Sequence, residues 1–139
     1  MITLDQARTI IAGTRAKGRS LGLAPLTVVV LDAGGHVVAM EREDGASYGR
    51  PEIATGKAAG ALAMGVPSRK LGEMAAERPQ FLAALSVAWE GKLIPAAGGV
   101  LVKDSAGTLL GAVGVTGDLS DKDEEAALAG IAEAGLATG

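Results

Sequence analysis

The chain has 139 residues, of which 48% are hydrophobic and 21% charged, which is typical of a globular protein and excludes a disordered or collagen-like chain. Its formal net charge of −3 lacks the basic excess with which nucleic-acid-binding proteins attract phosphate. No apolar run reaches the roughly 18 residues of a membrane-spanning helix, and no basic and apolar signal region opens the sequence. We therefore expect one cytoplasmic domain, residues 1–139, that binds neither nucleic acid nor membrane.

Missing residue types exclude several kinds of site. The chain has no cysteine, which excludes disulfides, iron–sulfur clusters, zinc thiolate sites and a thiolate nucleophile. His36 is the only histidine, so one subunit cannot supply two histidine ligands or more than one imidazole base. We predict no metal-ion site in this chain.

The predicted elements begin with an amphipathic helix. Thr3 to Gln6 has the capping-box pattern, apolar residues then recur at helical spacing to Leu21, and Pro25 ends the segment. The β-branched run 26–31 predicts a buried strand, followed by a turn at 32–35 and a second strand, 36–42. Alternation along this second strand places one set of side chains on one face, namely His36, Val38, Met40 and Arg42, and another set on the other, namely Val37, Ala39 and Glu41.

The second half of the chain repeats this mixture of elements. A helix is predicted from Pro51 to about Met64, and two short helices cover 71–76 and 81–89, with starts marked by Ser68 and Pro79. A break at 95–99 precedes a second hairpin, 100–102 and 108–115. A final helix follows, which we expect the segment 120–123 to cap.

The order of these elements predicts the fold class. Strands joined as hairpins, with helices before, between and after them, indicate an α+β domain whose antiparallel sheet is flanked by helices. An internal similarity supports the hairpins, because residues 30–38 align without gaps on residues 102–110. We interpret the similarity as one turn used twice and not as a repeat protein.

Five motifs in a fixed order resemble a known family. They are Val-Leu-Asp-Ala-Gly-Gly-His-Val-Val-Ala-Met (30–40), Arg-Glu-Asp-Gly-Ala (42–46), Lys-Ala-Ala from Lys57, Pro-Ala-Ala-Gly-Gly (95–99), and Gly-Ala-Val-Gly-Val-Thr-Gly (111–117) with the later Asp123-Glu124 and Ala129-Gly130-Ile131. Together they resemble the GlcG/HbpS-like family, which includes the C-terminal domain of PduO-type proteins. The resemblance implies a profilin-like or PAS-like α/β/α sandwich, a homo-oligomer, and binding of haem or a related tetrapyrrole.

His36 is the candidate haem ligand, since imidazole nitrogen is the usual protein donor to haem iron. The alternative is a half-exposed strand residue without a ligand, because the internal similarity aligns His36 with Thr108. The methionines Met40, Met64 and Met74 are either soft ligands or core residues. Tyr48 is an acid–base or haem-ligand candidate, or a loop residue without a role.

Charged residues supply a second set of candidates. Arg42, with Asp44 beside it, could hold a carboxylate or propionate, or could belong to a solvated charge cluster or an internal ion pair. Lys57 lies at the edge of an apolar helix stripe, where a lysine either has a lowered pKa and acts as a base or anion-binding group, or extends its head into water.

Thr116 and Gly117 precede the predicted helix start at Ser120, which favours a second, anion-binding wall of a pocket. The glycines at 111, 114 and 117 lack the ending of a phosphate-binding loop and indicate bulges, close contact with a helix, or contact with a flat ligand. We interpret Asp121, Asp123 and Glu124 as helix-capping residues and not as metal ligands.

Three functions remain open from the sequence. The first is a small-ligand binding protein, with haem as the ligand that the resemblance implies. The alternative is a cofactor-independent isomerase, hydratase or lyase for a small carboxylate or aromatic metabolite, with Lys57 or His36 as base and Arg42 holding the anion. The third is a structural or regulatory oligomer without a ligand.

Overall fold

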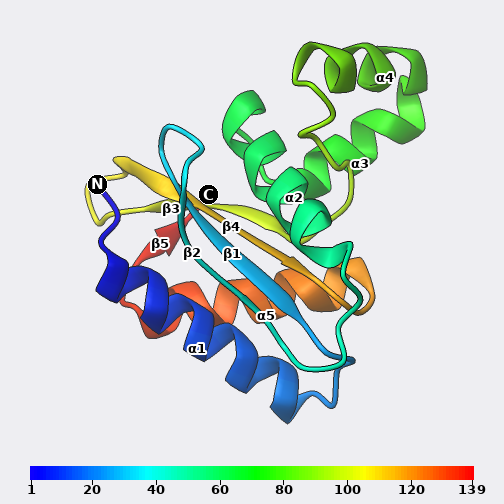
Figure 1. Ribbon diagram of the computed structural model, residues 1–139. Helices are drawn as coiled ribbons and strands as arrows, with labels where there is room; N and C mark the ends of the chain where they lie inside the picture. Colours follow the sequence, from blue (N-terminus) through cyan, green and yellow to red (C-terminus); the bar gives the residue numbers. More distant parts are fainter.

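The computed structural model describes all 139 residues, as five helices and five strands (Figure 1). The elements are α1 (Leu4–Ser20), β1 (Thr27–Asp32), β2 (Val37–Arg42), α2 (Arg50–Met64), α3 (Ser68–Glu77), α4 (Pro79–Ala88), β3 (Gly99–Lys103), β4 (Leu109–Thr116), α5 (Ser120–Glu133) and β5 (Ala137–Thr138). The predicted α+β class with an antiparallel sheet is confirmed. None of the helices is both long enough and apolar enough to cross a bilayer.

The five strands form one sheet in the order β2-β1-β4-β3-β5. Each hairpin pairs its own strands, and β1 then pairs with β4 over the whole length of β1, from Thr27 opposite Thr116 to Asp32 opposite Gly111. The two hairpins are therefore joined at their buried strands, which leaves β2 and the two-residue β5 as the edges.

Helices cover both faces of the sheet (Figure 1). The larger core lies on the face covered by α1 and α5, where Ile10, Ile11 and Ile131 pack against Val28 and Val113. A smaller core lies on the other face, where the alanine-rich α2 packs against the sheet. Helices α3 and α4 project away from the sheet and enclose a third, small cluster around Leu71, Leu82 and Leu93.

The two hairpins turn in the same way, as their sequence similarity predicts. Oδ1 of Asp32 accepts the backbone N–H groups two and four residues further along, and Oδ1 of Asp104 does the same in the second hairpin. The capping box at the start of α1 is also confirmed, because Thr3 and Gln6 each bond the other's backbone N–H.

Two local predictions are wrong, and one short strand was not predicted. Val38 packs on the α1 and α5 side together with Ala39, because a bulge between Val30 and Leu31 shifts the pairing and interrupts the alternation. Ser120 does not cap α5, whose N-cap is Leu119 without a side-chain hydrogen bond. Strand β5 was not expected, because two residues are too few for a pattern to indicate a strand.

The glycines of β4 permit close packing. A Cβ atom at Gly114 would overlap the backbone carbonyl of Ala54 in α2, and one at Gly111 would overlap the carbonyl of Leu31. Gly117 has a φ of +148° and lies against the carbonyl of Pro25. Of the alternatives for these glycines, close contact with a helix is confirmed for Gly114, whereas Gly111 and Gly117 lie against the backbone of β1 and of the segment before it.

Candidate functional site

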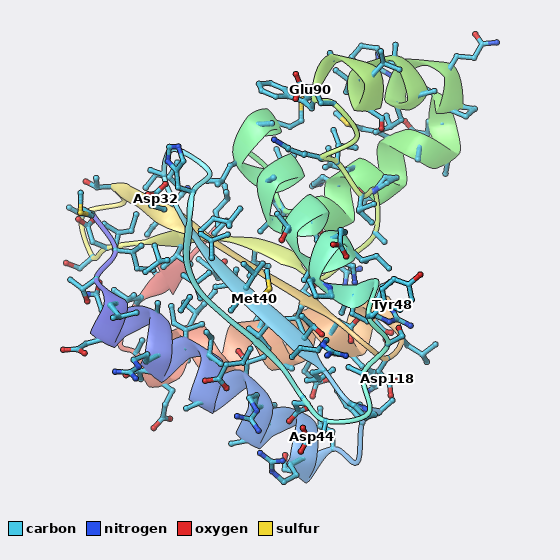
Figure 2. All side chains as sticks on the ribbon, viewed as in Figure 1. Asp32, Met40, Asp44, Tyr48, Glu90 and Asp118 are labelled. Carbon is cyan, nitrogen blue, oxygen red and sulfur yellow. The ribbon has the colours of Figure 1, made fainter.

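The candidate residues fall into three places. Figure 2 shows Asp32, four residues before His36, at the end of β1 where the turn to β2 begins, whereas Tyr48 and Asp118 lie toward the other end of the sheet. Arg42 and Thr116 also belong to that other end, because both are partners of Thr27 in the sheet. Lys57 lies in the interior between the sheet and the helices.

His36 lies at one wall of a surface groove. The groove has a volume of about 410 Å³ and is lined by the β1–β2 turn, by Ala59, Leu62 and Ala63 of α2, and by Trp89 and Lys92 after α4. Its lining is mixed, with five hydrophobic residues among nine, and it includes the imidazole of His36 and the side chain of Lys92. Ligand pockets of proteins have volumes of roughly 300–1,000 Å³, so the groove is large enough for a small molecule.

The imidazole of His36 is held by its own turn. Its side chain is 82% exposed, and Nδ1 lies 3.4 Å from Oδ1 of Asp32. The backbone N–H of His36, the N–H of Gly34 and the nearby imidazole lower the pKa of Asp32, so this carboxylate is charged at neutral pH. A carboxylate beside one ring nitrogen is a common arrangement for a metal-binding histidine, and it leaves Nε2 free.

Lys57 forms a buried ion pair. Its Nζ donates to the carbonyl of Val115 at 2.9 Å and to Oδ2 of Asp123 at 3.2 Å, and the two side chains are 3% and 1% exposed. Burial lowers the pKa of Lys57 and raises the pKa of Asp123, although each charge partly offsets the effect on the other. Lys57 therefore does not extend its head into water, and none of the five main cavities is lined by it.

Several of the sequence motifs meet around this ion pair. A Cβ atom at Gly98 would lie 2.9 Å from Nζ of Lys57, and one at Gly99 would overlap the carbonyl of Lys57. The buried hydroxyl of Ser68 accepts the N–H of Gly99 at 2.7 Å and donates to the carbonyl of Ala96 at 2.6 Å. The motifs at 57, 95–99, 111–117 and 123 thus share one interior contact, which ties α2 and α3 to β3, β4 and α5.

Arg42 and Thr116 lie in one row across three strands. Thr27 is the sheet partner of both, so the three residues stand side by side on the face that α2 covers. Arg42 donates to the carbonyl of Ala46 at 2.7 Å, and Arg50 of α2 donates to Oγ1 of Thr116 at 2.9 Å. Thr116 is buried, and the hydroxyl of Thr27 is buried without any hydrogen-bond partner.

The remaining candidates lie apart from this row or have other partners. Asp44 lines a separate small cavity beside the end of α1. Asp123 accepts the N–H of Asp118 just before α5, and its other carboxylate oxygen binds Lys57, so this residue does more than the helix capping that we expected. Glu124 forms an ion pair with Arg69.

Tyr48 is 89% exposed, whereas Met64 and Met74 pack in the small cluster of α3 and α4.

Four residues of these sites were not expected from the sequence. Trp89 and Lys92 reach the His36 groove because the chain turns just after α4 ends at Ala88. Glu90 has a φ of 56° there, which is unusual for a residue other than glycine, and Gly91 also has a positive φ. Arg50 and Thr27 complete the row with Arg42. An arginine at a helix start and a threonine at a strand start carry no pattern of their own, so only the strand pairing could have found them.

Taken together, these elements define an α/β/α sandwich with a surface groove large enough for a small molecule. The chain belongs to the HbpS-like family, whose model, described as haem-degrading protein HbpS-like, matches residues 2–132. No curated protein is significantly similar to the chain.

Solved structures of the same fold are similar over almost the whole chain. A crystal structure of a PduOC–haem complex is 24% identical, with a TM-score of 0.87 over 99% of this chain and 97% of that one. Klebsiella pneumoniae protein ORFY is 24% identical, with a TM-score of 0.86 over 96% and 90% of the two chains. A double mutant of HbpS from Streptomyces reticuli is 26% identical, with a TM-score of 0.79 over 94% and 85%.

Proposed function

We propose that the protein binds haem, or a tetrapyrrole of similar shape, in the groove beside His36. The observation that carries the proposal is the position of the only imidazole at a groove that is also lined by Ala59, Leu62 and Trp89, with Nδ1 facing Asp32. Membership of the HbpS-like family and the similarity to a PduOC–haem complex support it.

The groove offers groups that fit the parts of a haem. Nε2 of His36 would bind the iron, since neutral imidazole is a common axial ligand. Ala59, Leu62 and Trp89 would contact the apolar ring, and the ammonium of Lys92 would pair with a propionate. Bound haem would supply the redox and ligand-binding chemistry of its iron, whereas the chain supplies the binding surface.

A hemin titration followed by the Soret band tests the proposal. We expect saturation at about one hemin per subunit in the micromolar range or tighter, and loss of the shifted band in His36→Ala. Thr108→Ala is the matched control, because Thr108 has the same position in the other hairpin and lies outside the groove. Lys92→Gln should weaken binding while keeping the spectrum, since it removes the propionate partner but not the iron ligand.

The outcome that contradicts the proposal is equally clear. Weak binding that does not saturate, or saturable binding with the same spectrum in His36→Ala and Thr108→Ala, would show that hemin adsorbs elsewhere. Circular dichroism of each variant checks that the fold is intact. We propose no reaction, because the candidate base Lys57 is buried and paired with Asp123.

We also infer that the protein forms a homo-oligomer through α4. This helix contains no charged residue, only Leu82 of its ten residues is buried, and Phe81, Val87 and Trp89 are exposed around it. Depletion of charge and enrichment of aromatic residues are typical of interface cores, and interfaces between identical subunits are particularly apolar. Light scattering after gel filtration should give a molar mass that is a multiple of 13.8 kDa, and this mass should be lower in Val87→Glu. A monomeric wild-type protein would refute the inference.

A further inference from the structure

The row formed by Arg42, Thr27, Thr116 and Arg50 contains more hydrogen-bond donors than acceptors. Strands in a sheet lie about 4.8 Å apart, so Arg42 and Thr116 stand about 10 Å from each other with Thr27 between them. Arginine has only donors, and the hydroxyl of Thr116, which accepts from Arg50, keeps its own proton to donate.

The two arginines of the row have no carboxylate partner. Arg15, Arg19 and Arg69 all form ion pairs, whereas Arg42 and Arg50 each bond one uncharged oxygen. The carboxylates of Glu43, Asp118 and Asp123 have other partners. Glu43 binds Arg15, Arg19 and a backbone N–H, Asp118 accepts the N–H groups of Ala24 and Leu119, and Asp123 binds Lys57.

Thr27 adds an independent observation. Its side chain is completely buried and its hydroxyl has no partner, although an unsatisfied buried hydroxyl is costly. The hydroxyl lies on the same face of the sheet as Arg42 and Thr116, since cross-strand partners point to one side. A ligand oxygen in the row would satisfy this hydroxyl and both arginines together.

We propose that the row binds the carboxylate of a small organic acid. A carboxylate has two oxygens with about four acceptor positions, which match two guanidinium groups and two hydroxyls. To reach Thr27 it takes the place of the Ala46 carbonyl on Arg42, the one hydrogen bond by which that guanidinium is held. This site lies at the other end of β1 from His36 and does not depend on haem binding.

Acetate is the probe that tests the site. We expect sodium acetate to raise the melting temperature saturably above a sodium chloride control of equal ionic strength, over a range up to about 100 mM, which is a hundredfold excess over a dissociation constant near 1 mM. Arg50→Gln and Thr27→Val should each weaken acetate binding at least tenfold. Thr27→Val should not lower the stability of the free protein, because it removes only an unpaired hydroxyl.

Two matched controls separate the site from general effects. Arg8→Gln removes an exposed arginine that forms no ion pair, and Thr14→Val removes the other unpaired buried hydroxyl, which lies between α1 and α5. Both should bind acetate within twofold of the wild type, as should His36→Ala, so the result is independent of the haem site.

Three results would overturn the proposal. The first is an acetate effect no larger than that of chloride. The second is an equal loss of binding in Thr27→Val and Thr14→Val. The third is phosphate binding as tightly as acetate with the same dependence on Arg50, which would make the row a general anion site.

Discussion

Lys57→Met should destabilise the protein by about 3–5 kcal/mol, because it leaves the carboxylate of Asp123 buried without its counter-charge. Methionine keeps most of the volume and the unbranched shape of the lysine side chain, so packing changes little. The carbonyl of Val115 also loses its bond to Nζ. The expected loss therefore comes from charge and hydrogen bonding.

The geometry sets the size of this effect. Two unit charges 3.2 Å apart attract by about 5 kcal/mol at an effective dielectric constant near 20. That attraction is no longer available in the variant, whereas Asp123 stays desolvated by its surroundings. Replacing both partners, as in Lys57→Met with Asp123→Leu, should therefore give a more stable protein than the single substitution.

The destabilisation of Lys57→Met should depend on pH. Burial already raises the pKa of Asp123, and losing the ammonium that opposes this rise moves the pKa further upward. A carboxyl group whose pKa is higher in the folded state than in the unfolded state stabilises the fold at low pH. This contribution is lost as the pH rises through the folded-state pKa. The free energy of unfolding of the variant should thus recover toward that of the wild type as the pH falls through the raised pKa of Asp123.

Guanidinium chloride unfolding followed by circular dichroism measures both effects, with equal m-values required for the comparison. Lys70→Met is the control, since Lys70 pairs with Glu73 on the surface and should cost less than about 1 kcal/mol. A loss below about 1 kcal/mol in Lys57→Met, independent of pH, would refute the reasoning and mean that solvent reaches Asp123.

Three further predictions concern single side chains. Gly114→Ala should destabilise by about 3 kcal/mol or more, since its Cβ would overlap a carbonyl of α2, whereas Gly49→Ala, in open space, should cost less than about 1 kcal/mol in the same unfolding assay. Ser68→Ala should cost about 1–3 kcal/mol, because it leaves a buried amide and a carbonyl without partners. Ser68→Thr should also lose stability, because the side chain of Ser68 is 0% exposed and leaves little space for an added methyl group. Asp32→Ala should lower the melting temperature at neutral pH, and the difference should shrink as pH falls through the lowered pKa of Asp32, where wild-type protein loses the same interactions.

Local patterns predicted most of the elements. Turn and cap signals depend on neighbours a few residues away, so the bonds of Asp32, Asp104 and Thr3 follow from spacing alone. The bulge that turns Val38 to the other face depends on the pairing between strands, which no pattern within one strand contains. The start of α5 was also misplaced by one residue, because Leu119 occupies the N-cap that the sequence assigned to Ser120.

In the candidate sites, too, the sequence indicated single residues but not their partners from distant parts of the chain. The sequence indicated an unusual Lys57 from its position beside an apolar stripe, but its partner Asp123 is 66 residues away and resembled a capping residue. Arg42 and Thr116 were both expected to bind a ligand, and the sheet places them in one row; whether they do so stays a prediction. Arg50 and Thr27 could not be found without knowing which strands are neighbours.

The pairing of β1 with β4 has a consequence for synthesis of the chain. The first hairpin is complete within the first 42 residues, yet its central strand lacks a neighbour until residues 111–116 exist, and the apolar face of α1 lacks α5 until residues 120–133 follow. At roughly 5–20 residues per second, translation exposes Ile10 and Ile11 for on the order of 10 s. During that interval the nascent chain carries the surface that chaperones bind, so its yield in the cell should depend on how fast residues 111–133 are translated.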